Sequence, residues 1–114
     1  MMKNNIVLVS FPFDDFSSQK VRPALCLTEP IGIHRHVVLA FITSRIPQHP
    51  LPSDVVIKAD DIGFATTGLR VSSTIQLHRM MTVSVSIIRR KLGELPPSLH
   101  PQVESRLQML FGLA

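Results

Sequence analysis

The sequence has 114 residues, enough for one domain with a buried core but too few for two, and we expect a single domain over residues 1–114. Hydrophobic residues make up 45% of the chain and charged residues 18%, which excludes an intrinsically disordered protein. Twelve Lys and Arg against eight Asp and Glu give a net charge of +4. That charge is compatible with a polyanionic partner, but ordinary domains can be equally basic.

Cysteine content and hydropathy indicate the compartment. Cys26 is the single cysteine, so no internal disulfide forms and a reducing environment is expected. It lies in the apolar run 24–27 and is expected to pack as a small hydrophobic residue. We see no signal peptide and no apolar stretch of the roughly 20 residues that span a membrane. We therefore expect a cytoplasmic protein without a membrane segment.

The first half of the chain predicts three strands separated by polar loops. β-Branched and aromatic residues favour strands in the segments 6–11, 22–28 and 36–43. Pro12 ends the first strand, residues 13–21 form a polar loop, and residues 29–32 form a turn. The third strand is apolar on both faces, because odd positions from Val37 and even positions from Val38 are all apolar. Such a strand belongs in the middle of a closed or sandwiched sheet.

The second half predicts three shorter strands and a helix. The strands are 54–57, 73–81 and 85–92; three prolines make residues 46–53 a loop, and residues 59–68 form a loop or a short helical turn. Apolar residues recur at one helical face in the tail: Leu99, Val103, Leu107 and Leu110.

The ends of this helix have sequence signals of their own. We expect Ser98 as the N-cap, Pro101 in the first turn and Gly112 as the stop. The predicted fold is mainly β: a small barrel closed by a C-terminal helix.

Strand pairing brings two polar residues together. If the second and third strands form a hairpin centred near Gly32 and Ile33, the numbers of facing residues sum to about 65. Arg22 then faces Thr43 at one rim of the sheet.

Several segments resemble the MazF/PemK toxin family. The segments are 6–13 (IVLVSFPF), 21–25 (VRPAL), 41–44 (FITS), 88–95 (IRRKLGEL) and 110–113 (LFGL), and their order spans nearly the whole chain. The resemblance implies an SH3-like barrel of the CcdB/Kid type, a homodimer, and an antitoxin partner that blocks the site. It also implies that Arg22 and Thr43 belong to the catalytic site of a sequence-selective endoribonuclease.

The chemistry of RNA cleavage suits these residue types. The RNA 2′-OH is the nucleophile, and cleavage needs a base, a cation over the developing phosphorane charge and an acid for the leaving oxygen. Arg22 can fork onto phosphate oxygens, and Thr43 can donate a hydrogen bond to the same phosphate. We expect further RNA contacts from four residues: Lys20, Ser44, Gln76 and Arg79.

The chain departs from the family pattern in two places. Asn4-Asn5 replaces the Gly-Asp that usually introduces the first strand, a change that we expect to alter only a turn. In the segment 76–79 (QLHR), where Kid-type members carry Arg-x-Asp-Gln, Gln76 replaces an arginine and His78 replaces the proposed aspartate base. An imidazole titrates near pH 6.5 and can act as a base. His78 is therefore a candidate third catalytic residue, and a solvated histidine in a degenerate toxin is the alternative.

Other features carry less functional information. His34 and His36 lack a third ligand at useful spacing, so we expect no metal and no cofactor. The adjacent aspartates 14–15 and 60–61 are expected to be solvated, and the basic run 89–91 alternates between the two faces of a strand.

Residues 80–85 add apolar surface that favours a dimer. Two rival functions stay open: a non-catalytic binding protein similar to the gyrase inhibitors of this fold, and a degenerate member that binds RNA or antitoxin.

Overall fold

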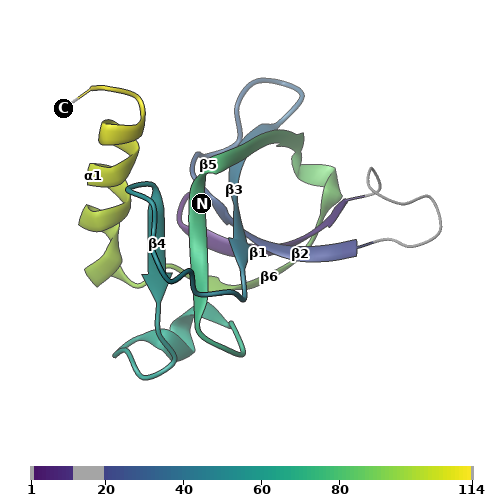
Figure 1. The fold of residues 1–114 in the computed structure, drawn as a ribbon. Coiled ribbons are helices and arrows are strands. Elements are labelled where there is room, and N and C mark those ends of the chain that lie inside the picture. The colour runs from purple at the N-terminus through teal and green to yellow at the C-terminus, as the bar shows by residue number, and fades with distance from the viewer. Residues whose placement is uncertain (1, 12–19, 114) are drawn as a thin grey trace.

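The computed structural model describes residues 2–11 and 20–113, apart from the side chains of Phe11 and Lys20. The predicted loop at 13–21, with the aspartates 14–15, therefore lies almost wholly outside the described residues. One antiparallel sheet has the strand order β4-β5-β3-β2-β1-β6 and curls on itself (Figure 1). Its strands are β1 (Asn5–Phe11), β2 (Lys20–Cys26), β3 (His36–Thr43), β4 (Asp54–Ile57), β5 (Ser73–Ser84) and β6 (Ile88–Glu94).

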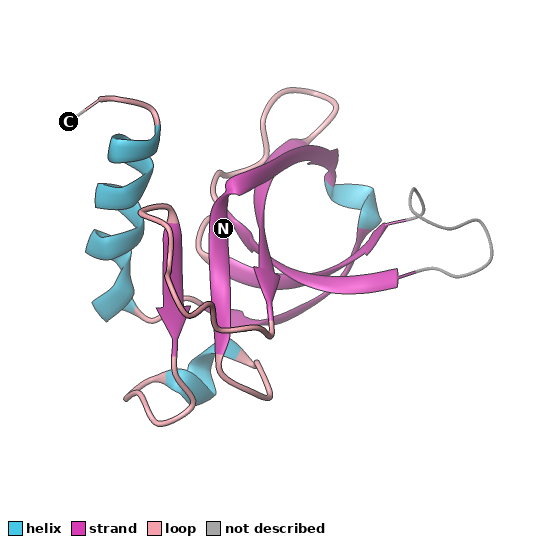
Figure 2. Cartoon of the chain, viewed as in Figure 1, coloured by secondary structure: helices cyan, strands magenta, loops and turns pink. Residues whose placement is uncertain are grey.

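Helical segments connect and close the sheet. Short 3-10 turns are η1 (Phe64–Thr67), η2 (Val85–Ile87) and η3 (Pro97–Leu99), and the α-helix is α1 (His100–Leu110). Figure 2 shows α1 standing beside β4, and α1 contacts β4 and β5. The predicted six strands and C-terminal helix are confirmed. β2 begins and ends two residues earlier than predicted, and β5 continues to Ser84 before η2 makes the connection to β6.

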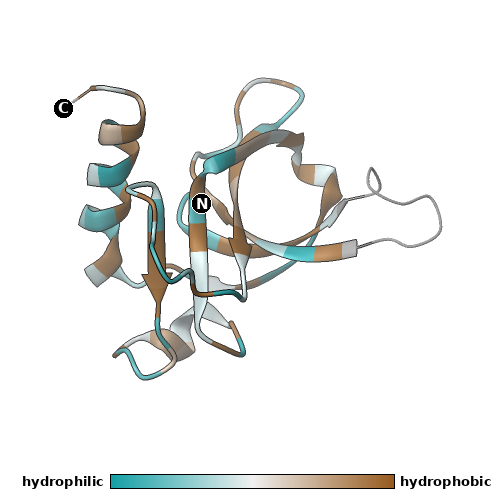
Figure 3. Cartoon of the chain, viewed as in Figure 1, coloured by the Kyte–Doolittle hydropathy of each residue, from teal (hydrophilic) through white to brown (hydrophobic). Residues whose placement is uncertain are grey.

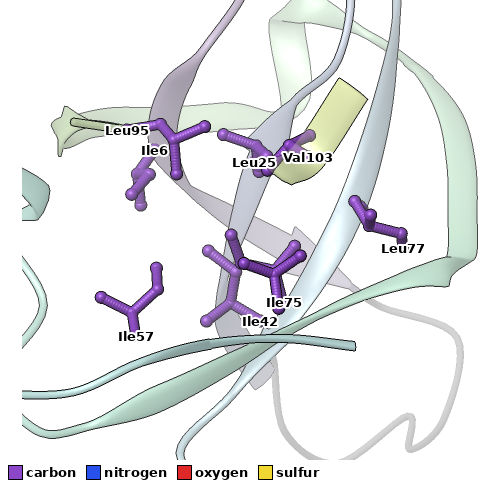
Figure 4. Packing of buried hydrophobic residues seen from close by; sticks show 10 residues of the cluster. Ile6, Leu25, Ile42, Ile57, Ile75, Leu77, Leu95 and Val103 are labelled. Atoms are coloured by element: carbon purple, nitrogen blue, oxygen red, sulfur yellow. The ribbon is translucent and has the colours of Figure 1, made fainter. Parts of the chain in front are cut away.

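β3 separates two hydrophobic clusters, as its two apolar faces predict. Ala40 and Ile42 belong to the cluster that α1 covers, which also contains Ile6, Leu25, Ile75 and Leu77 (Figure 4). Val37 and Leu39 belong to a second cluster on the other face, with Val7, Val9 and Cys26. The hydropathy colouring shows apolar segments along the strands that surround both clusters (Figure 3). Burying each large aliphatic side chain stabilises the fold by about 1.5–3 kcal/mol.

Three of the four predicted apolar positions, one in η3 and two in α1, pack against the sheet. Val103 is buried, and Leu99 and Leu107 pack against the first cluster. Leu110 is 39% exposed, so the predicted stripe does not reach the last turn of the helix. Gly112 adopts a φ of 67° after the helix, as a C-terminal stop requires.

The predicted N-cap of this helix is wrong. Ser98 lies within η3, and α1 begins at His100 with Leu99 in the cap position and no side-chain cap. The His100 ring contacts the Leu95 carbonyl instead, with Nε2 and O 3.0 Å apart. The two prolines at 96 and 97 explain the difference, because they favour a separate 3-10 turn before the α-helix starts.

Two further expectations bear on the surface. Asn4 adopts a φ of 71°, a conformation that Gly and Asn share, so the departure from Gly-Asp leaves a turn there. The apolar segment 80–85 is largely covered within one chain: Val83 is buried, and Met81 and Val85 pack against the second cluster. Met80, Met81 and Val85 are nevertheless only partly buried, so the expectation that this segment adds apolar surface for a dimer stays a prediction. No helix among the described residues is long and apolar enough to cross a membrane.

Candidate functional site

The β2–β3 hairpin has the predicted register. Ala24 pairs with Phe41, Leu25 with Ala40 and Cys26 with Leu39, so each pair of numbers sums to 65. Arg22 and Thr43 lie just beyond these pairs, at the rim where β2 enters the sheet and β3 leaves it. Both residues line one open cleft of about 500 Å³, which we call the phosphate cleft after the ligand that the sequence predicts for them. The structure thus brings together the two residues that the hairpin predicts to be neighbours.

The phosphate cleft is strongly cationic. Arg45 and Arg70 line it together with Arg22, and none of the described residues that line it is acidic. All three arginines are exposed, and none forms an ion pair within the part of the chain that the structure describes. Three guanidinium groups around one cleft attract a polyanion.

Thr43 is oriented by the start of the following loop. Its Oγ1 accepts a hydrogen bond from the Arg45 N–H at 3.3 Å, which leaves the hydroxyl proton available for a ligand. The Arg45 carbonyl in turn accepts a hydrogen bond from Thr74 Oγ1 at 2.8 Å, so the loop is tied to β5. Ser44 also lines the phosphate cleft, as its predicted role requires.

The segment that carries Arg70 is held by a close contact with β6. Gly68 adopts a φ of 74°, and a Cβ added there would lie 2.0 Å from the Leu92 carbonyl oxygen. Thr67 is fully buried, and its hydroxyl donates to the Phe64 carbonyl at 2.6 Å. The turn thereby fixes the backbone two residues before Arg70.

β5 bulges next to the phosphate cleft. Ala40 pairs with Met80 while the next residue of β3, Phe41, pairs with Gln76, so residues 77–79 have no partner in β3. Bulges of this kind re-aim side chains and occur often beside active sites. Gln76 and His78 line a second pocket of about 400 Å³, which we call the side pocket. Thr43 and Arg45 line both spaces, so the two are contiguous.

The His78 ring is held by a serine. Its Nδ1 lies 2.8 Å from Ser53 Oγ, and Leu77 N–H donates to the Ser53 carbonyl at 3.0 Å. If Nδ1 carries the proton and donates to the hydroxyl, Nε2 is left with a free lone pair. The ring is exposed, so a ligand can reach it.

Asp54 is a buried carboxyl group in the wall of the side pocket. It is 6% exposed, and its Oδ2 accepts a hydrogen bond from the Leu51 N–H at 2.9 Å. The other oxygen, Oδ1, is buried and has no hydrogen-bond partner in the structure. Buried polar atoms without partners are rare in folded proteins.

The remaining predicted contacts are not gathered in these two spaces. The Arg79 guanidinium lies over the Phe41 ring, 6.0 Å from its centroid, and lines neither of them. The side chain of Lys20 lies outside the described residues, although its backbone begins β2.

The less informative candidates occupy other places. Burial, with a smaller contribution from the negative charge of Glu29, raises the pKa of the Cys26 thiol to about 11. Lys91 pairs with Glu94 at 3.3 Å on β6, and the rings of His34 and His36 lie 6.1 Å apart. Within residues 2–11 and 20–113, no group of three or more His, Cys, Asp or Glu side chains is placed to hold a metal ion.

Three polar residues of the site were missed by the sequence reasoning. Arg45 stands two positions after Thr43, and that proximity alone could have flagged it. Arg70 lies in the irregular segment between η1 and β5, and Asp54 begins β4 after the irregular segment at 44–53. The sequence does not fix the course of these segments, so only the folded chain shows that both residues lie near Thr43.

Comparison with known proteins agrees with the fold. The family model described as PemK-like, MazF-like toxin of type II toxin–antitoxin systems matches residues 2–111. Mycobacterium tuberculosis toxin MazF-mt6 shares 24% identity with a TM-score of 0.72, covering 96% of this chain and 98% of that chain. MazF in the MazE–MazF structure from Deinococcus radiodurans shares 20% identity with a TM-score of 0.75, covering 100% and 97%.

A mycobacterial endoribonuclease in complex with its cognate antitoxin shares 15% identity with a TM-score of 0.71, covering 100% of this chain and 97% of that chain. No curated protein sequence matches the chain at a significant level. At these identities the solved structures establish the fold, a six-stranded sheet with a C-terminal helix, while the family model covers almost every residue. The chain therefore belongs to the PemK-like, MazF-like toxins of type II toxin–antitoxin systems.

Proposed function

We propose that this toxin is an endoribonuclease that cleaves single-stranded RNA without a metal ion. The observation that carries the proposal is the phosphate cleft, where Arg22 and Thr43 meet Arg45 and Arg70, and where no carboxylate occurs among the described lining residues. A gyrase-type binding surface has no need for a clamp of this kind. One structural neighbour is itself an endoribonuclease, which supports the same activity class.

The proposed reaction uses the nucleophile that RNA provides. The 2′-oxygen attacks the adjacent phosphorus and loses its proton, the P–O5′ bond breaks, and the departing 5′-oxygen takes up a proton. The product is a 2′,3′-cyclic phosphate. Arg22 stabilises the negative charge that develops on the phosphorane oxygens, and the Thr43 hydroxyl donates to the same oxygens. Arg45, Arg70 and Ser44 hold neighbouring phosphates.

His78 is the proposed base. Ser53 holds Nδ1, so Nε2 is the nitrogen available to accept the 2′-OH proton. Gln76 contributes a neutral contact where the family has an arginine, and Arg70 brings a positive charge into the contiguous cleft. Lys20 and Arg79 remain proposed contacts for the RNA beyond the cleft.

A second candidate function rests on the same substitutions. With Gln76 and His78 in place of arginine and aspartate, the protein can be a degenerate toxin that binds RNA or its antitoxin and cuts nothing. We also propose an acidic antitoxin that covers the cationic cleft, as expected for a member of this family, and a homodimer in the cytoplasm.

Cleavage of a long RNA by the purified protein, in excess EDTA, tests the proposed activity. Arg22→Ala and Thr43→Ala should each lower the rate about 10²–10³-fold, because each removes a donor to the transition state. Arg22→Lys should recover part of the loss, since it keeps the charge without the fork. The control is Arg90→Ala, an exposed arginine on β6 that lines neither space.

The outcomes separate the two candidate functions. Both cleft variants should melt like the wild type, because rim positions contribute under about 1 kcal/mol to stability. Full activity of either cleft variant refutes the site. An inert wild type that still binds RNA tightly, and loses that binding in Arg22→Ala, establishes the degenerate binder instead.

A further inference from the structure

The side pocket has a composition that the cleavage chemistry does not explain. Its apolar lining comes from the loop between β3 and β4, where Ile46 is 46% exposed and Leu51 is 52% exposed. Its polar lining includes the buried Asp54 and the partly buried Gln76. A planar group that enters the pocket would therefore meet apolar side chains, the imidazole ring of His49 and hydrogen-bonding groups.

Asp54 is the feature of this pocket that calls for a ligand. Oδ2 and the backbone of Asp54 close a tight turn with Leu51, since Asp54 N–H donates to the Leu51 carbonyl at 2.9 Å. Oδ1 is left buried in the structure with no donor. An acceptor that is removed from water without a hydrogen bond destabilises the fold, and a donor from a ligand would reverse that penalty.

The position of the pocket selects the kind of ligand. It shares Thr43 and Arg45 with the phosphate cleft, so a group bound there belongs to a molecule whose phosphate lies next door. In single-stranded RNA that group is a nucleobase, which proteins hold by stacking and by hydrogen bonds to its Watson–Crick edge. A volume of about 400 Å³ is within the range of small-molecule sites.

We propose that the side pocket is a guanine-reading subsite in which Asp54 accepts hydrogen bonds from the Watson–Crick edge of the base. This inference rests on the proposed RNA cleavage and specifies the base preference of the same site. Guanine is favoured because its N1–H and N2–H₂ are two adjacent donors, which match the acceptor-only edge of a carboxylate. On the corresponding edges of adenine, cytosine and uracil each donor lies beside an acceptor that would face the carboxylate.

Binding to single-stranded DNA octamers tests the subsite without requiring cleavage, because the octamers lack the 2′-OH. The reference octamer contains only deoxyuridine. In a second set of octamers, one guanine replaces deoxyuridine at each position in turn. In a third set, inosine, which lacks the N2 amino group, takes the place of that guanine. Fluorescence anisotropy should show that guanine at one position tightens binding by about tenfold or more, and that inosine loses most of the gain. Equal affinity for all three octamers overturns the proposal.

Asp54→Asn is the variant that tests the acceptor. The amide keeps the shape of the side chain but replaces one acceptor oxygen with a donor. The variant should therefore bind the octamers with and without guanine about equally well. The matched control is Asp60→Asn, which removes an exposed carboxylate of the same charge that lines neither space. A guanine preference that survives in Asp54→Asn overturns the proposal, and Asp54 is then only the clamp of the Leu51 turn.

Mapping the cut sites of a long RNA separates this inference from the proposed activity. If the wild type cleaves, one position beside the cut should be guanine, and Asp54→Asn should relax that position while cleavage continues. Cuts without any guanine preference contradict the subsite but leave the nuclease intact. If the wild type cuts nothing, the nuclease proposal fails while the octamer experiment still decides whether the pocket binds guanine. The inosine octamers need no variant, so the test stands even if Asp54→Asn does not fold.

Discussion

The two nitrogens of the His78 ring have different surroundings, and this difference carries a kinetic consequence. Nδ1 is held by Ser53, and the ring as a whole is exposed. If Nε2 takes the 2′-OH proton, the ring must be neutral, so the cleavage rate should rise as pH is raised, with a rising limb that depends on the imidazole. His78→Ala should lose about 10²-fold or more and the rising limb of the profile. His78→Asp should retain activity and move the limb to lower pH.

Ser53→Ala separates positioning from proton transfer. It removes the partner of Nδ1 and leaves the imidazole in place, so the rate should fall less than in His78→Ala while the rising limb persists. A His78→Ala enzyme with the wild-type rate and pH profile would make His78 a bystander. A wild type that is inert until His78→Asp is combined with Gln76→Arg would identify a degenerate toxin.

The buried Cys26 thiol in the second cluster should make the stability of the fold depend on pH in the alkaline range. Burial raises the pKa of its thiol in the folded chain to about 11, against 9.0 as the ordinary value. The thiol of the unfolded chain therefore loses its proton at lower pH than the thiol of the folded chain, and this favours unfolding. The buried thiol contributes fully to the free energy of unfolding below pH 9, and this contribution is lost as pH rises towards 11.

Urea unfolding of the wild type and of Cys26→Ala between pH 8 and about 11 measures this linkage. The free energy of unfolding should fall more steeply in the wild type than in the variant, with a difference on the order of 1–3 kcal/mol across the interval. Parallel curves would show that the thiol titrates alike in the folded and unfolded chains.

At the scale of elements, the tightest constraint lies where the segment before Arg70 crosses β6. Gly68 and Gly32 share nearly the same left-handed φ, 74° and 72°, but only Gly68 has backbone atoms where a Cβ would go. Alanine at either position meets the same conformational strain of about 1–2 kcal/mol. Gly68→Ala should lose a further 1–3 kcal/mol or so through the steric clash, and it should also weaken RNA binding by displacing Arg70.

Chemical denaturation of the two alanine variants isolates the steric term, because the shared φ cancels between them. Gly32→Ala should retain RNA cleavage, since nothing lies within 4 Å of its added Cβ. Equal losses of stability in both variants would contradict the predicted steric cost, because they would show that the backbone at Leu92 moves to accommodate the added Cβ without strain.

The elements also show which parts of the structure a sequence can predict. The bounds of β3 and β4 follow from their apolar pattern, and the hairpin register follows from the position of the turn, so the neighbourhood of Arg22 and Thr43 was predictable. The bulge at 77–79 was not predictable from the sequence, because it arises where β5 pairs with β3 and β4 at once. The N-cap at Ser98 failed because the two prolines before it impose a 3-10 turn.

At the scale of the whole molecule, the cationic and polar groups meet at one end of the curled sheet. Residues from β2, β3, β4 and β5 and from two loops line the contiguous cleft and side pocket, although they are distant in sequence. The net charge of +4 predicts a polyanion only weakly, whereas the local cluster of Arg22, Arg45 and Arg70 is a more specific indication of one. That cluster could not be read from the chain, since it depends on how the segments at 44–53 and 58–72 fold back onto the sheet.

The central claim is that the 2′-OH of the substrate is the nucleophile, and one substitution in the RNA tests it most directly. After the cut site is mapped, two oligonucleotides are compared in EDTA: one with ribose throughout, and one with a single 2′-deoxynucleotide on the 5′ side of the cut. The ribose substrate should yield a 2′,3′-cyclic phosphate or its 3′-phosphate product, and the deoxy substrate should stay intact. Cleavage of the deoxy substrate, or products with a 3′-hydroxyl and a 5′-phosphate, would contradict the mechanism.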